Sequence, residues 1–307
     1  MRIRISSAPC CWGVDDPRNP NLPPWQQVLD EAAAAGYKGI ELGPYGYLPL
    51  DIETVSAALE ARGLTIVAGT IFDDLVDPAN LDNLLRQTRE ICALLSRLPK
   101  LAQETGQHFA APYLVLIDHV HAERSLVAGH PDEAPRLSPE RWAQTMGHIR
   151  AIAELARDEY GIRAVVHPHA GGYIEFADET LRLLADIPYE VAGLCLDTGH
   201  LYYSNMDPVE WIREHQDRID YLHLKDIEPA VYTEVMQHPV DFFAACVLGV
   251  MCPIGQGVVD YDAIYQLLRD IDYQGYVTIE QERDPRNAAG SLQDVTASLE
   301  YLQGKGF

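Results

Sequence analysis

Short apolar runs alternate with longer amphipathic segments along the whole chain. The runs are rich in β-branched residues, and several, such as the Arg-Ala-Val-Val segment at 163–166, are nearly continuous in apolar character. This pattern is typical of parallel strands that are covered on both faces. Eight runs are candidate strands, at 2–6, 38–42, 65–70, 113–118, 163–167, 192–197, 221–225 and 276–280.

Helical signals fill the spaces between these runs. Segment 25–35 places its apolar residues on one helical face, and Gly36 follows as a stop signal. Ser138 and Pro139 supply an N-cap and a proline at the first helical position, and the long helix that they begin is expected to end before Gly161.

Eight strands that are each followed by helical sequence predict a closed (β/α)8 TIM barrel, with residues 1–307 forming one domain. The alternative is an open doubly wound sheet, which a glycine-rich phosphate fingerprint after an early strand would favour. The first strand leads instead into Ala-Pro-Cys-Cys-Trp-Gly, which contains no GxGxxG pattern. The closed barrel is therefore the preferred fold.

Three stretches, at 15–24, 119–137 and 228–257, are longer than ordinary connections between a strand and its helix. The second and third follow strands four and seven, so in a barrel both lie over the functional face. We expect them to be lids or pocket walls, and surface disorder is the alternative for 119–137. Segment 241–243, Asp-Phe-Phe, is expected to contribute to a pocket or to a contact with a neighbour.

Composition restricts the partners of this protein. The chain has 307 residues, 47% of them hydrophobic, and 46 acidic against 23 basic residues give a formal net charge of -23. Such an excess of negative charge opposes binding to nucleic acid or to an anionic membrane surface. No signal segment and no membrane-length apolar run is apparent, and the six cysteines show no CxxC pairing. These features predict a reduced, cytoplasmic protein.

Metal-ligand and acid/base residue types gather where the predicted strands end. They are Glu41 after strand two, His167 and His169 after strand five, Asp197 and His200 after strand six, His223 and Lys225 at strand seven, and Glu280 and Glu282 at strand eight. Each residue alone has an ordinary interpretation as a solvated, capping or core side chain. A barrel brings all of these strand ends to one rim, however, so their joint placement predicts a divalent metal site.

These motifs carry a family resemblance. The Asp-Thr-Gly-His segment at 197–200, the His-Leu-Lys-Asp segment at 223–226 and the Ile-Glu pair at 279–280 resemble the xylose isomerase-like barrel superfamily of sugar-phosphate isomerases and epimerases. More narrowly, the chain looks like inosose (2-keto-myo-inositol) dehydratases and their relatives. The likeness covers nearly the whole chain and continues at 8–16, 39–46, 68–73, 167–175 and 280–285.

The resemblance implies one divalent ion, which is Mn, Co, Zn or Mg, with Mn favoured. The implied ligands are Asp197, His223 and Glu280, together with one group from the strand-five region. Isomerases and epimerases of the superfamily usually have a glutamate at the end of strand five, where this chain has His167. Either His167 takes that ligand position, or Glu175 returns from the following loop to do so.

The resemblance also implies an activity. We expect a metal-dependent dehydratase acting on a keto-inositol or related keto-sugar, by proton abstraction α to a metal-polarised ketone and loss of the β-hydroxyl. His169 and His200 are the expected acid/base residues, with Lys225 as an electrostatic or proton-donating partner. The alternative is a metal-dependent sugar isomerase or epimerase that uses an enediolate.

Two more distant alternatives are a metal-dependent phosphodiesterase, which the negative charge disfavours, and a non-catalytic sugar-binding barrel, which the ligand set disfavours. Four residues are expected to contact the substrate: Trp12, Glu41, Tyr45 and Glu282. The resemblance leaves a homo-oligomer open, because relatives in the superfamily often associate.

Overall fold

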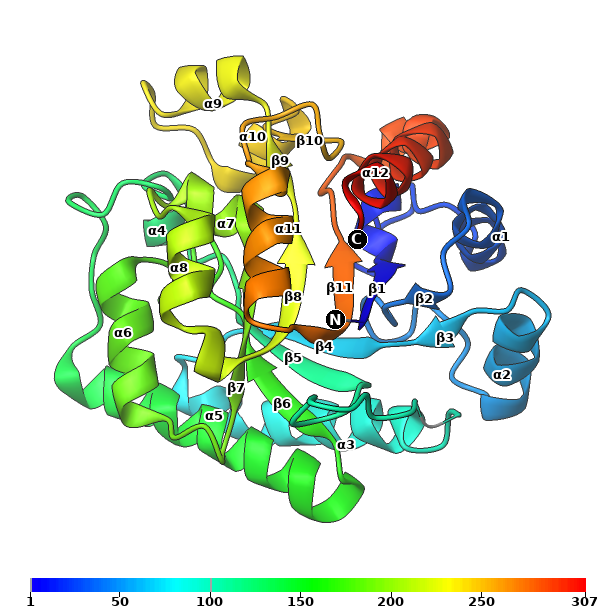
Figure 1. Ribbon diagram of the computed structural model, residues 1–307. Helices are drawn as coiled ribbons and strands as arrows, with labels where there is room; N and C mark the ends of the chain where they lie inside the picture. The colour runs from blue at the N-terminus through cyan, green and yellow to red at the C-terminus, as the bar shows by residue number, and fades with distance from the viewer. Residues whose placement is uncertain (1, 100) are drawn as a thin grey trace.

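Parallel strands follow one another around a closed sheet in the computed structural model, which describes residues 2–99 and 101–307 (Figure 1). The strands are β1 Arg2–Ser7, β2 Gly39–Ile40, β3 Thr65–Ile66, β4 Ala68–Asp73, β5 Tyr113–Asp118, β6 Arg163–Val166, β7 Gly193–Asp197, β8 Ile219–Leu224 and β11 Gln274–Ile279. Each pairs in parallel with its neighbour around the barrel, and β1 pairs with β11 along its full length.

The third barrel strand is split into β3 and β4 at Val67. β3 pairs with β2, while β4 pairs with β5. The two halves stay continuous because Val67 N donates to Ile40 O at 3.0 Å and Tyr113 N donates to Val67 O at 3.0 Å. The nine strand segments therefore make eight barrel strands, and the predicted (β/α)8 fold is confirmed.

Helices cover the outside of the barrel, in the order that the amphipathic segments predict (Figure 1). They include α1 Trp25–Ala35, α2 Ile52–Glu60, α3 Leu81–Leu95, α5 Pro139–Tyr160, α6 Ala177–Asp186, α7 Thr198–Tyr203, α8 Pro208–Glu214, α11 Tyr261–Asp270 and α12 Ser291–Lys305. The expected boundaries of α1 and α5 are confirmed: Gly36 ends α1 with φ of 105°, and the Ser138 hydroxyl accepts from Arg141 N at the start of α5.

Tyrosine side chains fill the lower interior of the barrel. Tyr113, Tyr221 and Tyr276 belong to one buried cluster with the inward-facing aliphatic residues. Alternate residues of a strand face the same side of the sheet, so His223 lies directly above Tyr221 on β8, with ring centroids 5.0 Å apart. The barrel is thus apolar below and polar at its C-terminal mouth.

The long segment after β8 forms an ordered cover on this mouth. It contains α9 Pro229–Val235 and α10 Phe242–Val247, with a small ribbon of β9 Asp226–Ile227 and β10 Met251–Cys252, all above the strand ends in Figure 1. The buried Asp226 carboxylate accepts hydrogen bonds from four backbone N–H groups, those of Ile227, Gly255, Gly257 and Val259. This network fixes the return of the chain to α11.

The other extended segment over the mouth, 119–137, is also ordered. It carries the short helix α4 Ala122–Ser125, whose Arg124 is completely buried. The guanidinium of Arg124 donates to Pro135 O at 2.7 Å and to the Glu179 carboxylate of α6. These contacts bind the segment to the barrel, so the alternative expectation of surface disorder is wrong.

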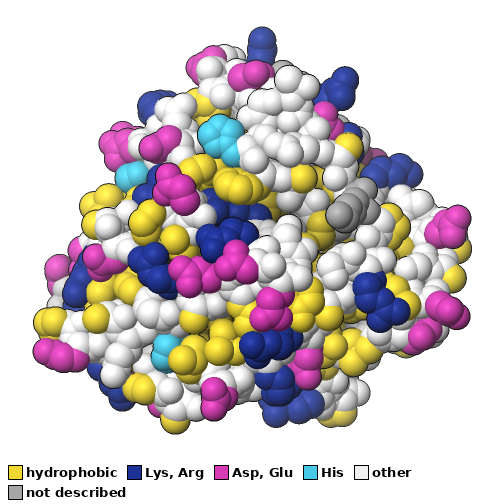
Figure 2. Space-filling view, turned by 90° about the horizontal axis from the view of Figure 1, so that it is seen from below, with side chains coloured by type: hydrophobic (Ala, Val, Ile, Leu, Met, Phe, Trp, Pro, Cys, Tyr) yellow, Lys and Arg dark blue, Asp and Glu magenta, His cyan; other side chains and the backbone are white. Residues whose placement is uncertain are grey.

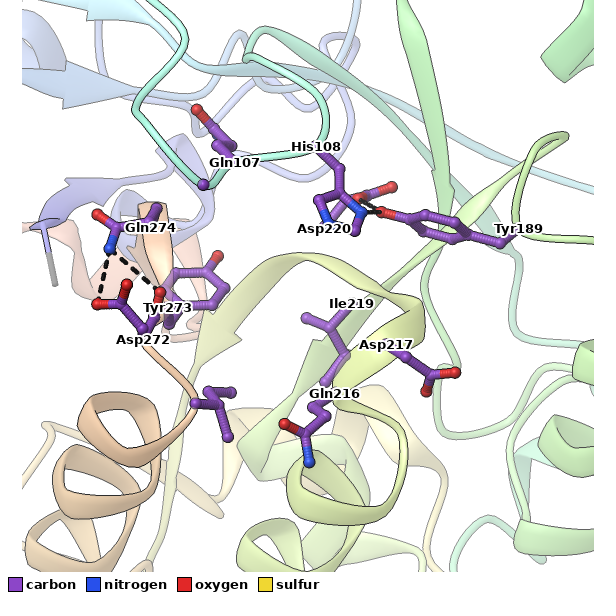
Figure 3. A pocket seen from close by; sticks show the side chains of 12 residues that line it. Gln107, His108, Tyr189, Gln216, Asp217, Ile219, Asp220, Asp272, Tyr273 and Gln274 are labelled. Carbon is purple, nitrogen blue, oxygen red and sulfur yellow. Dashed lines mark hydrogen bonds between the residues drawn. The ribbon is translucent and has the colours of Figure 1, made fainter.

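The opposite end of the barrel shows interleaved acidic and basic side chains rather than one basic surface (Figure 2). A cavity of about 130 Å³ lies there between the starts of β8 and β11 (Figure 3). Three of its polar groups are paired with one another: His108 Nδ1 lies 3.1 Å from the Tyr189 hydroxyl, which donates to Asp220. We interpret this end as structural.

Among the described residues, no helix has the length and apolar character needed to cross a membrane.

Candidate active site and metal centre

Four side chains converge at the C-terminal ends of neighbouring barrel strands. His167 follows β6, Asp197 ends β7, His223 lies in β8 and Glu280 follows β11. One ligand atom from each lies within 4.8 Å of the others. The side chains of His167, Asp197 and His223 are almost completely buried, and that of Glu280 is 12% exposed. The structure therefore brings together four of the five predicted metal ligands.

The hydrogen bonding of this cluster fits a cation. Both ring nitrogens of His167 are buried without a hydrogen-bond partner among the described residues, and Nδ1 of His223 faces the Glu280 carboxylate, with Oε2 at 3.0 Å, outside hydrogen-bond geometry. Nε2 of His223 lies 2.8 Å from Glu41 Oε1, which fixes the ring and directs Nδ1 toward the cluster. A carboxylate behind a histidine is the usual support of a metal-ligating imidazole. Two imidazoles and two carboxylates are a suitable ligand set for a divalent transition ion.

Among the described residues, Lys225 is the lysine whose ammonium group contacts this cluster. Its Nζ lies 2.6 Å from Asp197 Oδ2 and 3.2 Å from Glu282 Oε1, and it also donates to Glu280. Burial alone would raise the pKa of Asp197, but the Lys225 ammonium holds it well below its ordinary value. Glu41, which is bonded to His223 rather than to Lys225, adds a fourth carboxylate to the region. This excess of negative charge in a buried site favours a bound cation.

His169 and His200 form a second pair beside the cluster, with ring centroids 4.0 Å apart. His169 Nδ1 lies 2.8 Å from Ala170 O, which can only accept, so this nitrogen carries a proton. His200 Nδ1 lies 3.2 Å from Ala170 N, which can only donate, so this nitrogen carries the lone pair. The hydrogen bonds of Ala170 thus give the two neutral imidazoles opposite tautomers, with Nε2 an acceptor in His169 and a donor in His200.

Burial keeps both of these histidines uncharged. It lowers the pKa of His169 well below the ordinary value, and the neighbouring His200 adds to this effect. Burial likewise lowers the pKa of His200, assisted by the Lys225 ammonium. Nε2 of His200 is 3.6 Å from Glu282 Oε1. The site therefore offers one neutral proton acceptor and one neutral hydrogen-bond donor next to each other.

Glu175, the alternative fifth ligand, lies elsewhere. Its carboxylate accepts from Gly171 N at 2.8 Å, from Gly129 N at 2.7 Å and from the buried Arg124. These hydrogen bonds engage the carboxylate of Glu175 and hold it outside the cluster. Of the two candidates from the strand-five region, His167 therefore lies in the cluster and Glu175 does not. The N-cap residue of α6 is Phe176, and the Glu179 carboxylate accepts from the backbone N–H groups of Glu175 and Phe176.

Three of the four residues that we expected to contact the substrate have other surroundings. Trp12 is completely buried in the main core and donates to Glu31 of α1 at 2.6 Å. Tyr45 packs against the same core. Glu41 is buried, accepts from the Tyr221 hydroxyl at 2.7 Å and holds the ring of His223 in place. Substrate contact by these three residues stays a prediction.

Glu282 does reach an open pocket, of about 290 Å³, at the mouth of the barrel. The other lining residues are Cys10, Gly13, Asp15, Asn19, Asn21, Phe243, Cys246, Val247, Arg283, Asp284, Pro285 and Arg286. Phe243 fits the expectation that segment 241–243 contributes to a pocket. Asp15 and Arg283 were missed by the sequence reasoning, although both lie within segments that carry the family resemblance.

Comparisons with known proteins agree with this fold. Residues 29–303 match the family described as xylose isomerase-like TIM barrel. The inosose dehydratase of Clostridium botulinum (strain Alaska E43 / Type E3) is 27% identical over 320 residues, covering 99% of this chain and 97% of that protein. The inosose dehydratase of Geobacillus kaustophilus (strain HTA426) is 29% identical over 286 residues, covering 92% and 88%.

Solved structures share the barrel at lower identity. The probable 3-DHS dehydratase AsbF from Bacillus anthracis superposes with a TM-score of 0.71 at 18% identity, covering 98% of each chain. The IOLI protein, described with a binding zinc atom, superposes with a TM-score of 0.70 at 13% identity, covering 98% of this chain and 99% of that one. At these identities the likeness concerns the fold. Since the family match spans most of the sequence and the structure has the corresponding barrel, this chain belongs to the xylose isomerase-like TIM barrel family.

Proposed function

We propose that this chain is a divalent-metal-dependent dehydratase that removes water from a keto-inositol or a related keto-sugar. The observation that carries the proposal is the pair of oppositely tautomeric imidazoles, His169 and His200, beside the four-residue cluster. Dehydration next to a ketone needs one base for the α-proton and one donor for the departing β-hydroxyl. The pair supplies one group of each kind.

The proposed metal ligands are His167, Asp197, His223 and Glu280. When bound, the ion supplies Lewis acidity toward the ketone oxygen and an adjacent hydroxyl of the substrate. Imidazole suits Zn²⁺ and carboxylate suits Mn²⁺, so both ions, with Co²⁺, fit this mixed set better than Mg²⁺. Manganese is the first ion that we would test.

The roles of the chain's own residues follow from their hydrogen bonds. The unprotonated Nε2 of His169 takes the proton from the carbon α to the ketone. Nε2 of His200 donates a hydrogen bond to the oxygen of the β-hydroxyl. The carbon–oxygen bond breaks with its electron pair on that oxygen, and the electron pair left at the α-carbon forms the double bond. The proton that His169 took then joins the leaving oxygen, so that water is released and both imidazoles are neutral again. Lys225 holds Asp197 and Glu280 in place and adds a positive charge beside the developing negative charge.

The substrate class is taken from the relatives' printed names together with the mouth pocket. Its volume of about 290 Å³ is near the lower end of the size range for small-molecule sites. Carboxylates of Asp15 and Glu282 line it, and such acceptors suit the hydroxyl groups of a polyol. The free cysteines of the described chain are consistent with a reducing compartment, so we place the enzyme in the cytoplasm.

The proposal is tested by incubating protein loaded with each divalent ion in turn with 2-keto-myo-inositol. We expect the ultraviolet absorbance of a conjugated diketone to appear with at least one of the ions. Its absence with every ion would reject the dehydratase on this substrate. Solvent deuterium entering ketoses without absorbance would instead support the isomerase or epimerase alternative. A screen across inososes, ketohexoses and keto-glycosides then defines the substrate.

A further inference from the structure

We propose that the rim of the barrel holds a second divalent transition-metal site, formed by Asp74, His119 and His121. Asp74 follows β4 and the two histidines follow β5, which is the neighbouring strand. One ligand atom from each of the three residues lies within 4.8 Å of the others. No residue of the central cluster takes part, so the inference stands apart from the proposed function.

Asp74 is held in an orientation that suits a metal ligand. Its Oδ1 accepts from Val76 N and from Asp77 N, both at 2.8 Å. Its Oδ2 then faces His119 Nε2 at 3.8 Å, which is too long for a hydrogen bond. Two ligands that each bind one zinc ion at about 2.0–2.2 Å can lie as far apart as about 4 Å. The gap therefore matches an ion between the two groups.

His121 has the support that metal-ligating histidines usually have. Its Nε2 lies 3.0 Å from Asp118 Oδ2. The Asp118 carboxylate also accepts hydrogen bonds from Leu75 N and Tyr173 N. It is therefore ionised and accepts a hydrogen bond from His121 too. His121 consequently donates from Nε2 and keeps its lone pair on the other ring nitrogen. A carboxylate that orients an imidazole in this way raises its basicity toward a metal.

The site is open to an ion from solution. The side chains of His119 and Asp74 are 37% and 30% exposed, whereas His121 is buried beneath them. Three protein ligands leave the remaining coordination positions to water. Two imidazoles with one carboxylate favour Zn²⁺, Ni²⁺ or Co²⁺ over Mg²⁺ or Ca²⁺, which prefer oxygen ligands.

An ion here would join three loops of the rim. Asp74 and His119 belong to the loops after β4 and β5. His121 N donates to Gly171 O at 3.0 Å, and the His121 ring contacts Tyr173 with centroids 4.7 Å apart. Gly171 and Tyr173 lie in the loop that also carries His169. We therefore infer that the ion stabilises the loop that carries the proposed base, without contacting the substrate.

The test is a count of bound Zn²⁺ after equilibrium dialysis of the intact chain, by elemental analysis. We expect about two ions per chain in the wild type, and about one each in His119→Ala and in His223→Ala, since each change removes one ligand set. The exposed His238, which belongs to neither cluster, supplies the control: His238→Ala should keep the wild-type count.

Two further results bear on the proposal. In the double variant His119→Ala/His223→Ala, bound Zn²⁺ should fall to the background level. Zn²⁺ should also raise the melting temperature of His223→Ala, but not that of the double variant. If His223→Ala and the double variant bind the same amount of Zn²⁺, the proposed rim site is wrong. If the wild type has no dehydratase activity but His119→Ala still binds one ion fewer than the wild type, the proposed function is rejected and the rim site is supported.

Discussion

The imidazoles of His169 and His200 face each other at 4.0 Å and carry their protons on opposite nitrogens, because Ala170 O accepts from one ring and Ala170 N donates to the other. Both hydrogen bonds are made by backbone atoms, which do not titrate. The two rings are therefore fixed in different chemical states by the fold. This relationship is the basis of the first two predictions.

Replacing His169 with glutamine should remove the base while keeping a polar side chain of similar length. We expect kcat to fall by about 10²- to 10⁴-fold, the usual contribution of a general base. Exchange of the substrate's α-proton with solvent deuterium, followed by mass spectrometry, should be lost to the same extent. Metal content should not change, and a loss of bound metal would show that His169 is a ligand instead.

His200→Gln should separate the two halves of the reaction. We expect dehydration to slow by at least about tenfold, since the donor to the leaving hydroxyl is altered, while deuterium exchange at the α-carbon continues because His169 is intact. Measuring both rates in the same sample provides the comparison. Equal loss of exchange and dehydration would contradict separate roles for the two histidines.

Glu41→Gln should weaken metal binding although Glu41 is not one of the four proposed ligands. The substitution reduces the basicity of His223 and loosens the orientation of its ring. Loss of such a partner typically lowers metal affinity by about 10- to 100-fold. Titration with Co²⁺ followed by visible absorbance gives the affinity. Excess metal should restore activity. Activity that stays low at saturating metal would indicate direct contact with the substrate.

Lys225→Met tests whether the lysine and the ion balance the same negative charge. Without metal, the substitution leaves Asp197 and Glu280 buried without their ammonium partner, and we expect a loss of about 3–5 kcal/mol in the free energy of unfolding. Saturating divalent ion should recover much of that loss. Urea unfolding with and without metal measures the difference. An equal loss in both conditions would contradict shared charge balance.

Glu175 should make stability depend on pH. Burial outweighs the nearby Arg124 and raises the pKa of Glu175 from its ordinary 4.5 to about 7. The folded chain thus holds this proton more tightly than the unfolded chain does. The contribution to stability is complete below the unfolded pKa and is lost as pH rises to about 7.

Glu175→Gln, which cannot ionise, should lack this dependence. Between about pH 5 and pH 8 the free energy of unfolding of the wild type should fall relative to the variant by roughly 2.5 kcal/mol, from the cited shift in pKa. Urea denaturation across this range gives both curves. Parallel curves for the two proteins would show that Glu175 is already ionised at the lower pH.

The sequence by itself determined the order of strands and helices and the chemistry of the rim. The boundaries of α5 follow from Ser138 and Gly161, which act on backbone groups a few residues away. His223 and Asp197 could be placed at the mouth because each sits at the end of a short apolar strand. Such signals depend on neighbours along the chain, so they can be read without knowing the rest of the fold.

Only the tertiary structure decided which of these side chains meet. Glu175 had both the charge and the position of a ligand, but Arg124, 51 residues away in the chain, binds it elsewhere. Glu41 became the support of His223 through a contact across 182 residues. The tautomers of His169 and His200 likewise depend on how two loops fold around Ala170. These outcomes depend on side-chain direction and burial after the barrel closes, which local sequence patterns do not contain.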